Sequence, residues 1–224
     1  MHGAQILQVR GNFDAALVIV RELPPRAPVV AVNSFNPMRI EGQKTPGFEI
    51  VDILGDAPDV HFSAVGKPGR SRLRRDYREY RAAGRSTRLP RMLGFQAAGA
   101  APIVEGHRID RPETVATAIR IGNPASWAGA TGAACESADA ISAVADDQIP
   151  DGFHFLAEKE SVFCEPAAAA SAADLSKTEV PPGSRVVCVR TGNGLKDPDV
   201  AIRGARIPDV VNATLGPVLT TLTF

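Results

Sequence analysis

"VHFSAVGKPGR", residues 60–70, decides the fold because it runs from a strand pattern through a glycine turn into a helix start. Residues 60–65 form a short apolar run typical of a buried strand. Residues 91–104 repeat the pattern with a strand and a Gly/Ala turn, and residues 186–189 form another apolar strand. Apolar strands separated by helix-like segments predict an α/β fold, with mostly parallel open sheets flanked by helices.

The first residues repeat this alternation. An apolar run at 4–9 precedes a helical pattern at 13–23, which Pro24-Pro25 ends, and "PVVAVNS" (28–34) has the pattern of a fully buried strand. A lone β-α-β unit cannot cover both faces of its strands, so we expect the chain to begin partway into a larger sheet. Further helices are expected at 38–54 (broken or delayed near Pro46), 112–120, 124–135, 146–160 and 166–176.

Composition excludes several classes of protein. The 224 residues (23.6 kDa) suffice for one substantial core, and 25 basic against 25 acidic residues argue against a nucleic-acid binder. No apolar run is long enough to span a membrane and the first residues lack a secretory signal, so a cytoplasmic protein is expected. Three widely spaced cysteines argue against a disulfide framework and a metal site, and favour small core residues.

Two strand-end segments could carry chemistry. Gly66–Gly69 follows a strand and precedes a helix, so its backbone N–H groups could bind an anion; the alternative is an ordinary βα turn. Thr191 in "TGNGLKDPD" (191–199) follows the last strand, where its neutral hydroxyl could bond a ring nitrogen without protonating it. The alternative is a threonine that caps its own turn.

Five blocks, in order, carry a resemblance to a known family: "NSFNPMRIEGQKT" (33–45), "TRLPRMLGFQAAGAAPIV" (87–104), "ATAIRIGNPASW" (116–127), "VFCEPAAAASAA" (162–173) and "TGNGLKDPD". Together they resemble threonine synthase of the bacterial type, from residue 3 to about residue 200. The resemblance implies a pyridoxal-phosphate enzyme of the tryptophan synthase β-like fold (fold type II). It also implies a homodimer that converts O-phosphohomoserine and water into threonine and phosphate.

The resemblance also implies roles for particular residues. The cofactor phosphate would be held by the loop Gly66, Lys67, Pro68, Gly69 and Arg70, and the pyridine nitrogen would bond Thr191. Asn33 and Arg39 would bind the phosphate of the substrate, which suits an arginine fork. The alternative is that Asn33 ends a strand and Arg39 is a solvated helix residue. Glu165-Pro166 and Asn123-Pro124 would start helices.

Two departures from the family pattern matter. None of the five lysines (Lys44, Lys67, Lys159, Lys177 and Lys196) stands in the Lys-Asp-Arg context of the Schiff-base lysine, so the chain supplies no catalytic residue of that kind. The phosphate loop departs from the usual Gly-Asn-Ala-Gly-Asn, and Pro68 removes one N–H donor. Nine arginines from Arg70 to Arg91 favour a solvated basic helix over a nucleic-acid contact.

We therefore expect the later part of a threonine synthase, incomplete at the N-terminus, with weak cofactor affinity at most and no turnover alone. Residues 1–36 would end a small domain, and residues 37–224 would form most of the large cofactor-binding domain. The alternative function is a non-catalytic fold remnant that acts as a binding or interaction module, or as half of a split enzyme.

Overall fold

The computed structural model describes residues 3–32, 36–65, 70–124, 140–173, 175, 178–204, 209–213 and 220–221, without the side chains of residues 40, 70–74 and 204. No helix within these ranges is long and apolar enough to span a bilayer. Its elements are α1 (Phe13–Glu22), α2 (Pro37–Gly42), α3 (Thr45–Leu54), β1 (Val60–Ala64), α4 (Arg70–Ala82), β2 (Arg91–Ala97), η1 (Ala98–Ala100), α5 (Pro102–Glu105), η2 (Thr117–Ile119), β3 (Ala140–Val144), α7 (Gln148–Glu160), α8 (Pro166–Ala173), β4 (Val186–Val189), η3 (Gly194–Lys196) and α9 (Pro198–Gly204).

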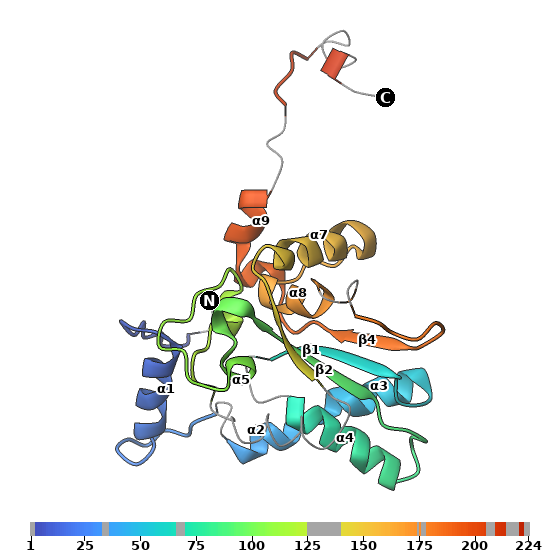
Figure 1. Cartoon of the computed structure of the whole chain (residues 1–224). Helices are drawn as coiled ribbons and strands as arrows, with labels where there is room; N and C mark the ends of the chain where they lie inside the picture. Colours follow the sequence, from blue (N-terminus) through green and yellow to red (C-terminus); the bar gives the residue numbers. More distant parts are fainter. Residues whose placement is uncertain are drawn as a thin grey trace.

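Four parallel strands form the sheet in the order β3-β2-β1-β4. Val60 on β1 pairs with Arg91 on β2 and with Val186 on β4, so strands far apart in the sequence are neighbours in space. Figure 1 shows α7 and α8 on one side of this sheet and α2 to α4 on the other, with α1 at the flank. The α/β prediction, with parallel strands flanked by helices, is confirmed.

The two central strands, β1 and β2, are buried on both faces, as their mainly apolar patterns predict. On one face Phe62 and Phe95 stack with ring centroids 5.5 Å apart and pack with residues of α8. On the other face Met92 packs with Tyr77 of α4 and Val51 of α3. Because successive strand residues point to opposite faces, each central strand contributes to both cores.

The alanine run of α8 lets that helix lie close to its neighbours. All eight residues of α8 are buried between the sheet and α7. A Cβ at Gly152 of α7 would lie only 2.8 Å from the backbone nitrogen of Ala173, so α7 and α8 need a glycine at this crossing. The helices expected at 146–160 and 166–176 are confirmed over 148–160 and 166–173.

The helix expected at 13–23 is confirmed as α1. Its N-terminus is capped by Asn12, whose Oδ1 accepts a hydrogen bond of 3.0 Å from the Ala15 N–H. The segment 38–54 divides into α2 and α3, with Pro46 in the first turn of α3, so the expected break near this proline is also confirmed.

Three predicted elements are wrong. Residues 4–9 and 28–32, the two strands of the expected β-α-β unit, form no strands and are largely exposed, because among the described residues no strand lies beside them. Residues 112–120 contain only the short η2, because Asp146 bonds the Thr114 hydroxyl at 2.6 Å and the Val115 N–H at 2.8 Å and so fixes a non-helical turn. The helix expected at 124–135 lies almost wholly outside the described residues.

Candidate cofactor site

The candidate site lies at the carboxyl ends of β1 and β4. Ser63 is paired with Val189, and continuing this register by two residues brings Val65 level with Thr191. Val65 is buried and donates a 2.6 Å hydrogen bond to the Phe95 carbonyl oxygen, so the start of the 66–69 loop is anchored to β2. Thr191 and the beginning of the predicted phosphate loop therefore share one edge of the sheet.

The loop itself, Gly66, Lys67, Pro68 and Gly69, lies outside the described residues, so its phosphate contacts stay a prediction. The helix that follows is described: α4 begins at Arg70 and has 13 residues. Its N-terminus, with the unpaired N–H groups and the positive end of the helix dipole, follows directly after the loop. This arrangement suits an anionic group at the same edge.

The two glycines of "TGNG" permit a close approach of two segments. The Glu165 N–H donates to the Gly192 carbonyl oxygen at 3.0 Å, and the Gly194 N–H donates to the Phe163 carbonyl oxygen at 3.3 Å. A Cβ at Gly192 would overlap the Glu165 side chain, and one at Gly194 would overlap the Phe163 ring. Glycine is thus needed here because residues 163–165 pass directly over the loop.

The loop after β4 is also tied to a distant part of the chain. The Thr117 hydroxyl donates a hydrogen bond of 2.8 Å to Asp197 Oδ2, across 80 positions of sequence. Within the loop, Asn193 Oδ1 accepts the Leu195 N–H at 2.9 Å and so begins η3. These bonds fix the loop after β4 beside residues 163–165. Thr191, at the start of this loop, remains exposed.

The predicted substrate residues are placed only in part. Asn33 lies outside the described residues. Arg39 lies on α2 and borders a hollow of about 420 Å³ whose other walls are mainly apolar residues of 20–32. The binding of a substrate phosphate by Asn33 and Arg39 stays a prediction.

Several helix-start and cysteine predictions can be compared with the structure. Glu165 directly precedes α8, where its carbonyl oxygen accepts the Ala168 N–H at 2.9 Å, so its helix-start role is confirmed. Cys164 is buried, and Cys188 packs against the main core; Cys135 lies outside the described residues. Burial raises the pKa of Cys188 to about 11 and also raises that of Cys164, so both thiols stay protonated near neutral pH.

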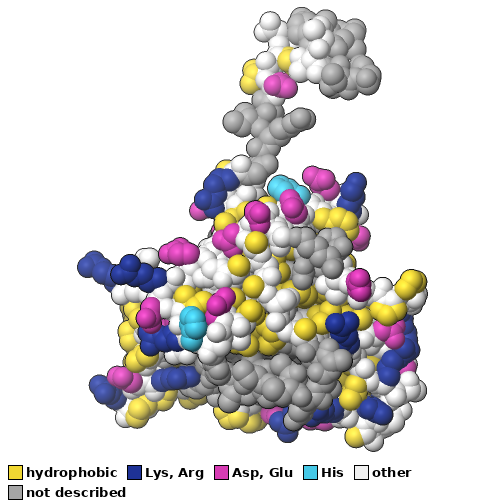
Figure 2. Space-filling model, in the orientation of Figure 1, with side chains coloured by type: hydrophobic (Ala, Val, Ile, Leu, Met, Phe, Trp, Pro, Cys, Tyr) yellow, Lys and Arg dark blue, Asp and Glu magenta, His cyan; other side chains and the backbone are white. Residues whose placement is uncertain are grey.

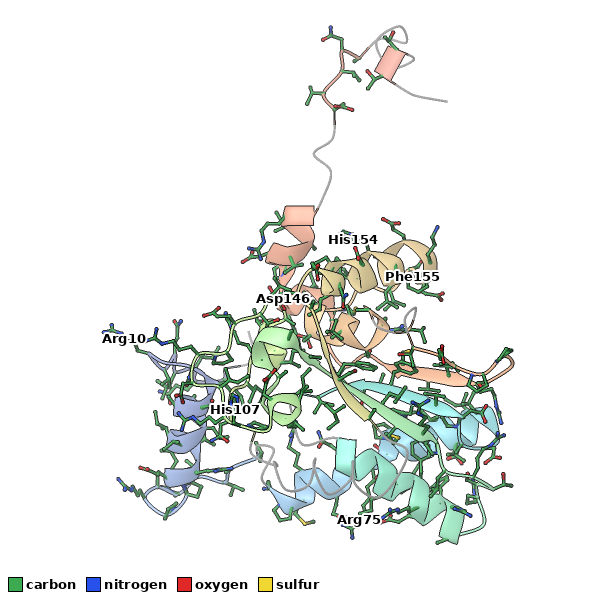
Figure 3. The ribbon with its side chains drawn as sticks, in the orientation of Figure 1. Arg10, Arg75, His107, Asp146, His154 and Phe155 are labelled. Carbon is green, nitrogen blue, oxygen red and sulfur yellow. The ribbon has the colours of Figure 1, made fainter. Side chains whose placement is uncertain are left out.

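Two positioning residues were missed by the sequence interpretation. Asp146, which follows β3 and is labelled in Figure 3, holds the turn at 114–116 beside the sheet. Ser171 lies within the buried alanine run, and its hydroxyl donates to the Ala168 carbonyl oxygen at 2.9 Å. The carbonyl oxygen of Val189 on β4 lies 3.3 Å from the same hydroxyl and is a second acceptor. The only polar residue in an otherwise apolar helix was the available signal for Ser171.

Comparison with known proteins gives the family of the chain. The family model described as "Pyridoxal-phosphate dependent enzyme" matches residues 1–192. The chain belongs to this family of pyridoxal-phosphate-dependent enzymes. Curated relatives named threonine synthase include one from Synechocystis sp. that is 51% identical over 208 residues. This match covers 92% of this chain and 54% of the relative. One from Mycobacterium bovis is 50% identical over 224 residues, covering 97% of this chain and 62% of the relative.

The chain thus spans a little over half of the length of these relatives, as a C-terminal portion of them. Among solved structures, maize serine racemase matches with a TM-score of 0.69 at 17% identity, covering 90% of this chain and 62% of that one. Serine racemase from Dictyostelium discoideum matches with a TM-score of 0.63 at 17% identity, covering 86% and 62%. These two structures support the fold alone, and pyridoxal phosphate is the cofactor that the family implies.

Proposed function

We propose that this chain is the part of a threonine synthase that holds the phosphate and the ring nitrogen of pyridoxal phosphate. The complete enzyme would convert O-phospho-L-homoserine and water into L-threonine and phosphate. The observation that carries the proposal is the β1–β4 register, which puts Thr191 at the sheet edge where the 66–69 loop begins. The relatives named threonine synthase, at about 50% identity, support the choice of reaction.

The residues present fit the cofactor in charge and in hydrogen-bonding type. The exposed Thr191 hydroxyl can donate to a ring nitrogen and leave it unprotonated, because a hydroxyl is too weak an acid to transfer its proton. Backbone N–H groups of residues 66, 67, 69 and 70 would bind the phosphate, helped by the N-terminus of α4. When bound, pyridoxal phosphate would supply an electron-withdrawing ring. Asn33 and Arg39 would orient the substrate phosphate.

Replacing Thr191 with valine should weaken pyridoxal phosphate binding by about tenfold, the loss expected for one hydrogen bond. Thr191→Ser keeps the hydroxyl and should bind like the unchanged chain, which makes it the matched control. Equilibrium dialysis of the purified chain against pyridoxal phosphate measures all three affinities. Equal affinity of the valine and serine variants would remove Thr191 from the site.

The chain by itself should show no turnover, since none of its lysines stands in the Lys-Asp-Arg context of the family's Schiff-base lysine. Among the described lysines, Lys44 is bound to Glu41 and lies 2.7 Å from Glu79, and Lys196 Nζ lies 3.9 Å from Glu165. Incubating the chain with pyridoxal phosphate and O-phosphohomoserine should release no more phosphate than a heat-killed control. Release above that level would show that the chain is active alone.

For the complete enzyme we expect a cytoplasmic homodimer that binds neither nucleic acid nor membranes. The second candidate function is half of a split enzyme, and it is favoured by the exposed apolar residues between positions 4 and 32. A non-catalytic module would instead fold stably and bind no cofactor.

A further inference from the structure

Glu165 differs from most acidic residues of the chain because its carboxylate is buried. Figure 2 shows many Asp and Glu side chains at the surface of the visible face, where water solvates them. The Glu165 side chain is only 7% exposed, and among the described residues its one ion-pair partner is Lys196, whose Nζ lies 3.9 Å from Oε1, too far for a hydrogen bond. A buried carboxylate with so loose a partner is costly, because its lost water contacts are only partly replaced. Such a departure from ordinary packing is expected where function requires it.

Glu165 contacts the loop after β4 through both its backbone and its side chain. Its N–H donates to the Gly192 carbonyl oxygen at 3.0 Å, and its carboxyl group lies directly against Gly192, where a Cβ would overlap it. Lys196 stands at the end of η3, so the pair with Glu165 reaches the far end of the same loop. One side chain therefore restrains both ends of the segment 191–196.

Glu165 is itself fixed in place by helix α8. Its carbonyl oxygen accepts the Ala168 N–H at 2.9 Å and the Ala169 N–H at 3.1 Å. All eight residues of α8 are buried, so the start of this helix has little room to move within the close-packed core. Through Glu165, the loop that begins at Thr191 is connected to a fully buried helix.

The position of the Thr191 hydroxyl depends on this loop. Thr191 is exposed, and its hydroxyl stands on a short, branched side chain that rotates about one bond, so the place of the oxygen follows the backbone. A backbone shift of about 1 Å would take the hydroxyl out of hydrogen-bonding range of a ligand atom. A glutamine at position 165 would fill the same space, but it would not attract Lys196.

We propose that Glu165 is a positioning residue for Thr191. Together with Lys196 it fixes the loop 191–196, so that the threonine hydroxyl is held at the sheet edge where it can donate to a pyridine nitrogen. This role rests on the proposed function, since Thr191 is taken as the group that contacts the cofactor ring. Glu165 itself needs no contact with cofactor or substrate.

The test uses the whole chain and, as the probe, pyridoxine phosphate, which has the ring nitrogen and the phosphate but no aldehyde and so forms no covalent bond with surface lysines. Equilibrium dialysis measures its affinity. Glu165→Gln should weaken binding by about fivefold, less than the complete loss of the Thr191 hydroxyl, because a displaced hydroxyl keeps part of its bond. Removing a negative charge would by itself favour an anion, so weaker binding is not a simple charge effect. Lys196→Met should weaken binding similarly, and Lys196→Arg, which keeps the positive charge, should bind like the unchanged chain.

A double-mutant cycle separates positioning from a general structural role. In the Thr191→Val background, Glu165→Gln should change the affinity by no more than about twofold, because it acts through the missing hydroxyl. Glu160→Gln removes an exposed carboxyl at the end of α7 and is the matched control, which should bind normally. Urea unfolding of each variant shows whether the fold is retained.

Hydrogen exchange tests the same role without any ligand. The N–H groups of residues 194–197 are all hydrogen-bonded, so their exchange reports how firmly the loop is held. Exchange there should become at least about threefold faster in Glu165→Gln and in Lys196→Met, and should stay unchanged in Glu160→Gln.

Three results would overturn this role of Glu165. Normal probe binding by Glu165→Gln and Lys196→Met, together with weak binding by Thr191→Val, would do so and leave the proposed function intact. An equal loss from Glu165→Gln with and without Thr191→Val would show that Glu165 acts independently of the hydroxyl. Unchanged exchange at residues 194–197 in both charge variants would show that the pair does not hold the loop. Normal binding by Thr191→Val is a different outcome, because it would remove Thr191 from the site and so count against the proposed function as well.

Discussion

Gly99→Ala is expected to lower the free energy of unfolding by about 3 kcal/mol or more, because the new Cβ would overlap a backbone atom that cannot move freely. Gly99 lies in η1 after β2, and a Cβ there would lie only 2.0 Å from the Glu113 carbonyl oxygen. The same contact includes a hydrogen bond of 3.0 Å from the Glu113 N–H to the Gly99 carbonyl oxygen. Relief of the overlap would therefore break this bond.

Urea unfolding followed by circular dichroism measures the effect. Gly42→Ala is the matched control: a Cβ at Gly42 meets nothing within 4 Å, and this glycine has no positive φ. The control variant should be as stable as the unchanged chain, or more stable by up to about 1 kcal/mol. If both variants unfolded at the same urea concentration, the close approach of residues 99 and 113 would be refuted.

Asp76→Asn is expected to remove a pH dependence of stability that the unchanged chain should show between about pH 4 and pH 7. Asp76 of α4 is fully buried beneath Gly47 of α3, and neither carboxylate oxygen has a hydrogen-bond partner among the described residues. Burial, with a smaller contribution from Glu79, raises the pKa of Asp76 from 3.8 to about 7, against the opposing effect of Lys44.

The direction in which stability changes with pH follows from the proton bound to Asp76. Between pH 3.8 and about pH 7 the folded chain keeps the proton on Asp76 and the unfolded chain has lost it, so raising the pH favours unfolding. The loss is complete above about pH 7 and amounts to roughly 4 kcal/mol, at about 1.4 kcal/mol for each pKa unit. The asparagine variant should lack this loss, and at pH 8 it should be the more stable protein.

Urea unfolding at pH 5 and pH 8 provides the comparison. Glu49→Gln removes an exposed carboxyl from α3, close in sequence to Gly47, and should retain the difference between the two pH values. A difference that persisted in Asp76→Asn would mean that another group is responsible for it.

Much of the central sheet could be predicted from local sequence. The strand patterns at 60–65, at the start of 91–104 and at 186–189 are mainly apolar, and they correspond to β1, β2 and β4. Strand β3 was missed because its sequence, Ala-Ile-Ser-Ala-Val, contains alanine and serine, which have low strand propensity. Its place at the edge of the sheet depends on pairing with β2.

The prediction of a strand at 28–34 was wrong for the described residues because a strand requires a neighbour as well as a suitable pattern. Apolarity is a property of the segment itself, whereas hydrogen-bonding partners are supplied by another strand. The described sheet contains none beside residues 28–32. The same apolar pattern therefore produces a strand at β1 and an exposed segment next to α1.

For the candidate site, the sequence indicated which residue types stand at the strand ends, including the hydroxyl of Thr191. It did not indicate the bond between Thr117 and Asp197, which joins residues 80 positions apart. Nor could it show that Gly192 and Gly194 are needed for the passage of residues 163–165. Turn chemistry is local, but the purpose of these glycines depends on a distant segment.

By itself, the sequence determined the α/β class, the helices α1, α7 and α8, and the family, because periodicity, caps and ordered motifs are properties of neighbouring residues. Only the tertiary structure decided that β1 lies between β2 and β4, that Asp76 is buried with no hydrogen-bond partner among the described residues, and that Ile6 and Val30 are exposed. These features depend on which distant segments meet, and a pattern confined to a few successive residues does not contain that information.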